Sequence, residues 1–127
     1  MKTSLREEVC KYVKEKYKSQ IESLWARFPN FVVFRRNDNK KWYGIIMDIT
    51  YQKLGLDRQG KVDVLNVKID WLLKDLLSEQ QGILPAYHMN KSKWISVLLD
   101  GSVELEDVFK LVDVSYNETA NNKKVAK

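Results

Sequence analysis

The sequence predicts a two-layer α+β domain with the order α-β(3)-α-β(2)-α, an antiparallel sheet and helices mainly on one face. Two observations lead to this prediction. The strand-like stretches are joined by short turns rather than long crossovers, which is typical of hairpins and antiparallel pairing. Amphipathic stretches with helical spacing lie before, between and after the strands. A chain of 127 residues suits one such domain.

The first helix is predicted from its N-terminal signal and its spacing. Ser4 and Glu7 have the spacing of a capping box, in which each side chain accepts a hydrogen bond from the other residue's backbone N–H. Lysines lie on other faces of this helix. Apolar residues recur at helical intervals at Leu5, Val9, Tyr12, Val13 and Tyr17.

Three strands follow in the sequence. Residues 31–36 and 41–49 are rich in β-branched and aromatic residues, and the polar segment 37–40 between them is typical of a turn, so they form a predicted hairpin. A second turn at 57–60 precedes a third strand over 62–69, in which Val62, Val64, Asn66 and Lys68 alternate with Asp63, Leu65, Val67 and Ile69.

The second helix is predicted to start after Asp70, a favourable N-cap residue. It ends before Gly82, which we expect to be the residue after the C-cap. Its apolar face consists of Leu72, Leu73, Leu76 and Leu77.

A second hairpin and a last helix complete the domain. Residues 84–88 and 93–99 are predicted strands around Asn90, because Pro85 forces an extended conformation on the residue before it. After a turn at 100–101, a helix carries acids in its first turn, where the helix dipole favours them. The domain spans 1–116, and the tail 117–127 lacks periodicity and is predicted to be disordered. The inward residues of the helix are Val108, Leu111, Val112 and Ser115.

Strand alternation predicts which side chains face the helices. The core set is predicted as Tyr43, Ile45, Met47 and Ile49 with Ile95, Val97 and Leu99, whereas Trp42, Gly44, Asn66, Lys68, Trp94 and Ser96 lie on the other face. The two tryptophans on a partly open face favour a stacking platform for bases. The alternative is that they only cover the second face of the sheet.

Charge and composition restrict the class of protein. The net charge is +5, and residues 1–60 carry 13 Lys/Arg against 7 Asp/Glu, which favours a polyanionic partner. The apolar runs fall far short of the roughly 18 residues that span a bilayer. The single cysteine, Cys10, is typical of a reducing compartment. We therefore expect a cytoplasmic protein without membrane attachment, and a monomer.

Motifs for catalysis or metal binding are incomplete. Residues 55–62 match the phosphate-binding loop G-x-x-x-x-G-K-[ST] except at Val62, and the segment leads into a strand rather than a helix, so we interpret it as a hairpin turn. His88 lacks a nucleophile-elbow serine, and one histidine with one distant cysteine does not form a zinc site. We expect no enzyme activity, no cofactor and no metal, with His88 hydrogen-bonded to its own loop.

Basic residues interleaved with aromatic ones lie at both predicted hairpin tips. Such tips suit contacts with a phosphate backbone, although a charged tip also keeps a sheet edge soluble. The candidate nucleic-acid contacts are Arg35, Arg36, Lys40, Lys41, Trp42, Lys68, His88, Asn90, Lys91, Lys93 and Trp94.

Several segments resemble the MmcQ/YjbR family. They are FVVFRRNDNKKWYGIIMDI (31–49), VDVLNVKID (62–70), GILPAYHMNKSKWISVLLDGSV (82–103) and LVDVSY (111–116). The resemblance implies a single α-β(3)-α-β(2)-α domain similar to CyaY and to secretion chaperones. It also implies DNA binding through a double-wing motif, and it brings no catalytic residues. The chain departs from many members at Lys93, where they have histidine, and at Glu104, where they have proline.

The sequence thus favours a small non-enzymatic module that contacts DNA phosphates through two basic hairpin tips, with little sequence preference. Two alternatives remain open. One is a protein-interaction or chaperone-like adaptor that uses the open sheet face. The other is a small-ligand site in the 85–94 loop, lined by Tyr87, His88, Asn90 and Trp94.

Overall fold

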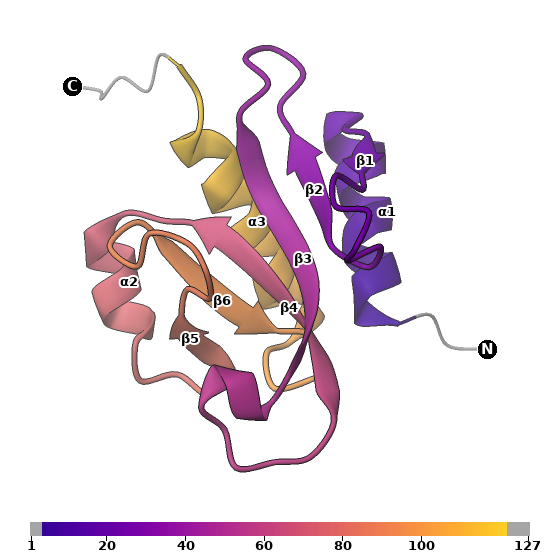
Figure 1. The fold of residues 1–127 in the computed structure, drawn as a ribbon. Coiled ribbons are helices and arrows are strands. Elements are labelled where there is room, and N and C mark those ends of the chain that lie inside the picture. The colour runs from indigo at the N-terminus through magenta and orange to yellow at the C-terminus, as the bar shows by residue number, and fades with distance from the viewer. Residues whose placement is uncertain (1–3, 122–127) are drawn as a thin grey trace.

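The structure of the protein is a computed structural model that describes residues 4–121 (Figure 1). The predicted α+β class is confirmed, and the predicted elements follow one another in the predicted order, with one additional two-residue strand after the first helix. The helices are α1 (Leu5–Tyr17), α2 (Trp71–Leu77) and α3 (Leu105–Glu118), with a short 3₁₀ helix η1 (Gln52–Leu54). The strands are β1 (Ile21–Glu22), β2 (Val32–Arg35), β3 (Trp42–Thr50), β4 (Lys61–Lys68), β5 (Ile83–Pro85) and β6 (Trp94–Leu98).

All six strands form one antiparallel sheet in the order β1-β2-β3-β4-β6-β5. The helices pack on one face, which we call the helix face; in Figure 1 α3 lies behind the sheet, so that the opposite, second face is turned toward the viewer. Val9 and Val13 of α1 and Leu111 and Val112 of α3 share one core with Leu65 of β4. The prediction that helices lie mainly on one face is therefore correct.

Local signals at the helix starts act as predicted. The Ser4 hydroxyl accepts from the Glu7 N–H at 3.1 Å, and the Glu7 carboxylate accepts from the Ser4 N–H at 3.0 Å. The Asp70 carboxylate caps α2 by accepting from the Leu73 N–H at 2.8 Å. In α3 the four residues predicted to point inward are all buried. The segment that resembles a phosphate-binding loop connects β3 to the antiparallel strand β4, as expected of a hairpin.

Several element boundaries differ from the prediction. Helix α2 ends at Leu77 with Ser78 as its C-cap, so Gly82 is not the residue after the C-cap; instead it turns the chain into β5 with a φ of 88°. Only Leu73 and Leu77 of its four leucines pack on the core. The second hairpin is shorter, because β5 ends at Pro85. Helix α3 continues to Glu118 and Thr119 is buried, whereas residues 122–127 of the predicted tail lie outside the described residues.

An irregularity in the β2–β3 pairing corrects the predicted face assignment. Phe34 pairs with Gly44 but Arg35 pairs with Trp42, so Tyr43 is an extra residue on β3. Tyr43 lies in the helix-face core as predicted, but Ile45, Met47 and Ile49, predicted for the same core, lie on the second face together with Trp42. Gly44 faces the Phe34 ring so closely that a Cβ at this position would clash with it.

The second face is also buried over much of its area, because connecting segments cover it. Residues Val33, Ile45, Met47, Ile49, Tyr51, Val62, Val64 and Leu98 form this second core. Aromatic and apolar side chains from the 25–31 segment, the 54–56 segment and the 86–89 loop pack against it. The predicted open sheet face is thus only partly open.

A polar network joins α1 to α3 on the helix face. The Asp113 carboxylate accepts hydrogen bonds from the Tyr17 hydroxyl at 2.6 Å and from the Tyr12 hydroxyl at 2.8 Å, and Lys16 Nζ lies 3.1 Å away. Burial alone raises the pKa of Asp113, but these hydrogen bonds outweigh it and hold the pKa below its ordinary value. Burial and the same carboxylate raise the pKa of Tyr17.

Within residues 4–121, no helix is long and apolar enough to cross a membrane.

Candidate nucleic-acid interface and groove

The topology brings together basic residues that are distant in the sequence. In an antiparallel sheet the start of β3, the end of β4 and the start of β6 lie at the same end, and β4 separates the other two strands. Lys68 at the end of β4 pairs with Trp94 at the start of β6. We call the exposed lysines at this end the basic edge; they are Lys40, Lys41, Lys91 and Lys93.

The two arginines of the β2–β3 hairpin have structural partners. Arg36 is only 7% exposed; its guanidinium donates to both Asp38 oxygens at 2.9 and 2.8 Å and to the Tyr116 carbonyl, and it lies 3.9 Å from the Tyr116 ring centroid. Arg35 donates to Glu22 at 3.0 Å and lies over the Trp42 ring. Arg36 is therefore not available to a phosphate, and Arg35 is already engaged.

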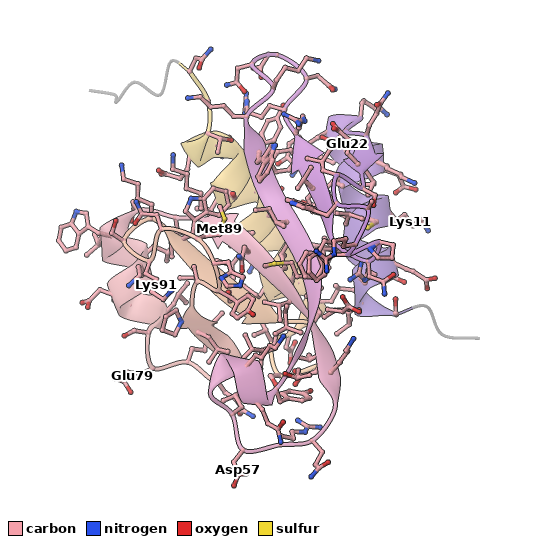
Figure 2. All side chains as sticks on the ribbon, viewed as in Figure 1. Lys11, Glu22, Asp57, Glu79, Met89 and Lys91 are labelled. Atoms are coloured by element: carbon pink, nitrogen blue, oxygen red, sulfur yellow. The ribbon has the colours of Figure 1, made fainter. Side chains whose placement is uncertain are left out.

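The loop over residues 86–93 is anchored by a buried polar pair. Asn66, predicted to be exposed, is fully buried, because its side-chain amide donates to the Tyr87 carbonyl at 2.9 Å. The Ser96 hydroxyl donates to Asn66 at 2.5 Å and accepts from the Tyr87 N–H at 2.9 Å. These bonds hold the backbone of Tyr87 against the second face, where Met89 of the same loop is labelled in Figure 2.

His88 and Asn90 have different roles in this loop. The His88 ring lies against the Tyr87 ring at 4.0 Å, and within residues 4–121 it has no hydrogen-bond partner, so its predicted bond to the loop is wrong. His88 also adopts a left-handed backbone conformation with a φ of 59°. The side-chain amide oxygen of Asn90 accepts from the Ser92 N–H at 2.9 Å and from the Ser92 hydroxyl at 2.7 Å, which closes the turn.

Both tryptophans of the predicted platform lie on the second face. The Trp42 ring lies edge-on to Trp25 at 5.9 Å, a contact that was not predicted. Trp94 is half-buried next to Lys68, itself partly buried. Trp42 covers the second core, as expected if the tryptophans only cover this face, whereas Trp94 keeps part of its surface in solvent, as a stacking platform requires.

A groove of about 480 Å³ runs over the second face beside these residues. Its floor is Ile45, Met47 and Ile49, one wall is the aromatic segment 25–31, and the other wall is Tyr87, His88 and Met89. The wall formed by segment 25–31 was not predicted, although the sequence places three aromatic residues, Trp25, Phe28 and Phe31, within seven positions. Lys53 and Lys61, also unpredicted, line the groove at the η1 end of β3.

The electrostatics of the groove are set by few charged groups. Lys61 Nζ lies 3.9 Å from the Asp48 carboxylate, which also accepts from the Asn30 amide at 3.1 Å. The Lys53 ammonium has no hydrogen-bond or ion-pair partner among the described residues. Over the same part of the chain, no three His, Cys, Asp or Glu side chains converge on a possible metal position.

Comparisons with known proteins agree with this architecture. The YjbR family model matches residues 11–118. The uncharacterized protein YyaQ of Bacillus subtilis (strain 168) is 40% identical over 114 residues, which are 90% of this chain and 97% of YyaQ. The uncharacterized protein YjbR of Escherichia coli (strain K12) is 40% identical over 50 residues, 39% of this chain and 42% of that protein.

Solved structures show the same fold. The crystal structure of a Pseudomonas syringae protein has a TM-score of 0.87 and 38% identity, covering 91% of this chain and 98% of its own. Deinococcus radiodurans protein DR2400 has a TM-score of 0.66 at 20% identity, covering 95% of this chain and 82% of its own, and shows the fold alone. With this fold and the family match over most of its length, the chain belongs to the YjbR family.

Proposed function

We propose that the protein is a non-enzymatic module that binds DNA through backbone phosphates, with the basic edge as its contact surface. The observation that carries this proposal is the convergence of two lysine pairs from separate hairpins at one end of the sheet. β3 and β6 lie two strand spacings apart, about 10 Å. Lysines that precede both strands therefore suit neighbouring points on one phosphate backbone.

The charges around the basic edge favour an anionic partner. Among the described residues its lysine ammonium groups have no ion-pair partner, and the two nearest acids of the β1–β3 region are already bound, Asp38 by Arg36 and Glu22 by Arg35. Contacts of this kind neutralise phosphates and release counterions. Because the phosphates are the same at every nucleotide, these contacts do not distinguish one DNA sequence from another. We expect dissociation constants of about 1 to 100 μM at physiological salt, nearly independent of sequence.

The test is fluorescence anisotropy of labelled duplex DNA over a range of salt concentrations. Replacing Lys41, Lys91 and Lys93 by Gln should lower the salt slope by about three units, one for each lost contact. A matched control replaces Lys11, Lys14 and Lys110, exposed lysines of α1 and α3, by Gln. Figure 2 shows Lys11 and Lys91 on opposite sides of the molecule. Absent binding at low salt, or equal losses in both triple variants, contradicts the proposal.

Single-stranded DNA adds a separate arm to this test. The partly exposed ring of Trp94 beside the basic edge suits stacking against an unpaired base. Trp94→Ala should weaken single-strand binding by about 1 to 3 kcal/mol and leave duplex binding nearly unchanged. An equal loss for both DNAs contradicts a stacking role for Trp94.

A second candidate function, a protein-interaction adaptor, is favoured by one observation. Helix α2 presents Trp71, Leu72 and Leu76 to solvent, exposed by 73%, 56% and 72%. Association through such an apolar surface depends weakly on salt, unlike phosphate contacts. A partner whose affinity is unaffected by salt and lost in Leu76→Ala would favour the adaptor.

A further inference from the structure

The groove on the second face has the form of a small-molecule site. Its volume of about 480 Å³ lies within the range of about 300 to 1,000 Å³ that is typical of ligand pockets. The floor is apolar and comes from the part of β3 that pairs without interruption with β4, so it is held in place by the sheet. An apolar floor of this kind favours the carbon skeleton of an organic molecule over a hydrated ion.

The aromatic wall is assembled before any ligand arrives. The Trp25 ring lies edge-on to Phe31 at 6.1 Å and to Trp42 at 5.9 Å, and Phe28 stacks on Phe31 at 4.8 Å. Phe28 is nevertheless 51% exposed, which leaves much of a large apolar ring in contact with water. Rings fixed edge-on and face-on in this way suit a planar aromatic body, which covers the exposed ring surface.

The opposite wall is equally fixed, because buried hydrogen bonds hold it. Asn66 and Ser96 bind both the carbonyl and the N–H of Tyr87, so the Tyr87 backbone cannot withdraw from the groove without leaving buried polar groups unpaired. Met89 adds a polarizable thioether to this wall, a favourable contact for an aromatic ring.

The groove also carries positive charge at its η1 end. The Lys53 ammonium has no partner among the described residues, and Lys61 is 65% exposed with only a long contact to Asp48. Asp48 is the one carboxylate among the residues that line the described groove, and it is shared with Asn30. Two ammonium groups at one end of an aromatic groove match an acidic group on the ligand.

We propose that this groove binds a small organic anion with a planar aromatic body. The rings lie between the Trp25–Phe31 wall and Tyr87–Met89, and the acidic group lies beside Lys53 and Lys61. Because this site uses different cations from the basic edge, ligand binding in the groove and DNA binding can be tested independently.

The test uses two fluorescent probes of similar shape. 1-Anilinonaphthalene-8-sulfonate carries an aromatic body and a sulfonate, whereas N-phenyl-1-naphthylamine is its neutral counterpart. Replacing Lys53 and Lys61 by Gln should weaken sulfonate binding about fivefold and change binding of the neutral probe by less than about twofold. Phe28→Ala should weaken both probes by about threefold or more. Energy transfer from tryptophan to the bound probe gives an independent readout.

Leu76→Ala on exposed helix α2 is the matched control, because this leucine is the other kind of apolar surface that attracts such probes. It should leave both affinities unchanged, and all variants should keep the unfolding midpoint of the parent. Three outcomes overturn the proposal: no probe binding, sulfonate binding lost in Leu76→Ala but kept in Phe28→Ala, or equal losses of both probes in the lysine variant. DNA binding of the Lys53 and Lys61 variant should remain, which separates this proposal from the previous one.

Discussion

On the helix face of the sheet, polar side chains form hydrogen bonds and ion pairs with one another. On the second face, by contrast, cations and aromatic rings remain accessible to a ligand. Asp113 binds two tyrosines and a lysine between α1 and α3, and Arg36 is held by Asp38 and Tyr116. The ammonium groups of Lys41, Lys53 and Lys91, by contrast, have no partner among residues 4–121. Positive charge alone therefore does not identify a binding surface. A cation is available to an external anion only where no group of the fold already binds it.

The largest difference between the faces should be seen in two neighbouring isoleucines of β3. Ile46 is fully buried under the helices, and Ile45 lines the groove. Ile46→Ala should lower the free energy of unfolding near the upper end of about 2 to 5 kcal/mol, and Ile45→Ala near the lower end, because the space left by Ile45 opens to solvent. Urea unfolding measures both. A larger loss for Ile45→Ala would mean that the groove is closed in solution.

A smaller effect should separate two cations of one hairpin. Arg36→Gln removes the guanidinium that satisfies Asp38 and the Tyr116 carbonyl, and should cost about 1 to 3 kcal/mol of unfolding free energy. Lys41→Gln on the basic edge should change it by less than about 0.5 kcal/mol. Thermal unfolding of both variants checks this. Equal changes in unfolding free energy for the two variants would show that the contacts of Arg36 do not stabilise the fold.

The pH dependence of stability should report the helix-face network. Because the pKa of Asp113 in the fold lies below its ordinary value of 3.8, its carboxylate stabilises the fold above about pH 4 and loses this effect as the pH falls through the lower folded pKa. Asp113→Asn should cost about 1 to 2 kcal/mol at pH 7, and the gap from the parent should narrow below pH 4. The control Asp57→Asn, on an exposed turn, should show no gap at either pH. A gap for Asp113→Asn that is constant down to pH 2 would contradict this assignment.

Much of the fold follows from signals within a few residues. The Ser4–Glu7 capping box, the Asp70 cap and the 37–40 turn depend on contacts between near neighbours, and each lies where it was predicted. The two-residue strand β1 was missed, because two residues carry no periodicity and pair only through contact with β2. The face assignment of β3 was right at Tyr43 but wrong at Ile45, Met47 and Ile49, since the bulge that shifts the alternation depends on the partner strand.

The candidate site was predicted only in part. Both hairpin tips and the shared face of Trp42 and Trp94 follow from alternation and turn spacing, which the sequence carries. Asn66 was assigned to solvent, because strand alternation does not indicate that the 86–93 loop folds over it. Of the small-ligand site predicted in the 85–94 loop, Tyr87 and His88 line the groove, whereas Asn90 and Trp94 do not. The other wall was missed, because the segment 25–31 meets the loop 86–89 only across β3.

The amino-acid sequence by itself thus determined the order of elements, the antiparallel hairpins and the positions of the basic residues, because caps, turns and alternation are short-range. Only the tertiary structure decided which cations remain free and which aromatic rings form a wall. Arg35 and Arg36 look like Lys40 and Lys41 in the sequence, but Glu22, Asp38 and Tyr116 reach the arginines alone. That choice depends on contacts between segments up to 80 residues apart, which only the packed chain brings together.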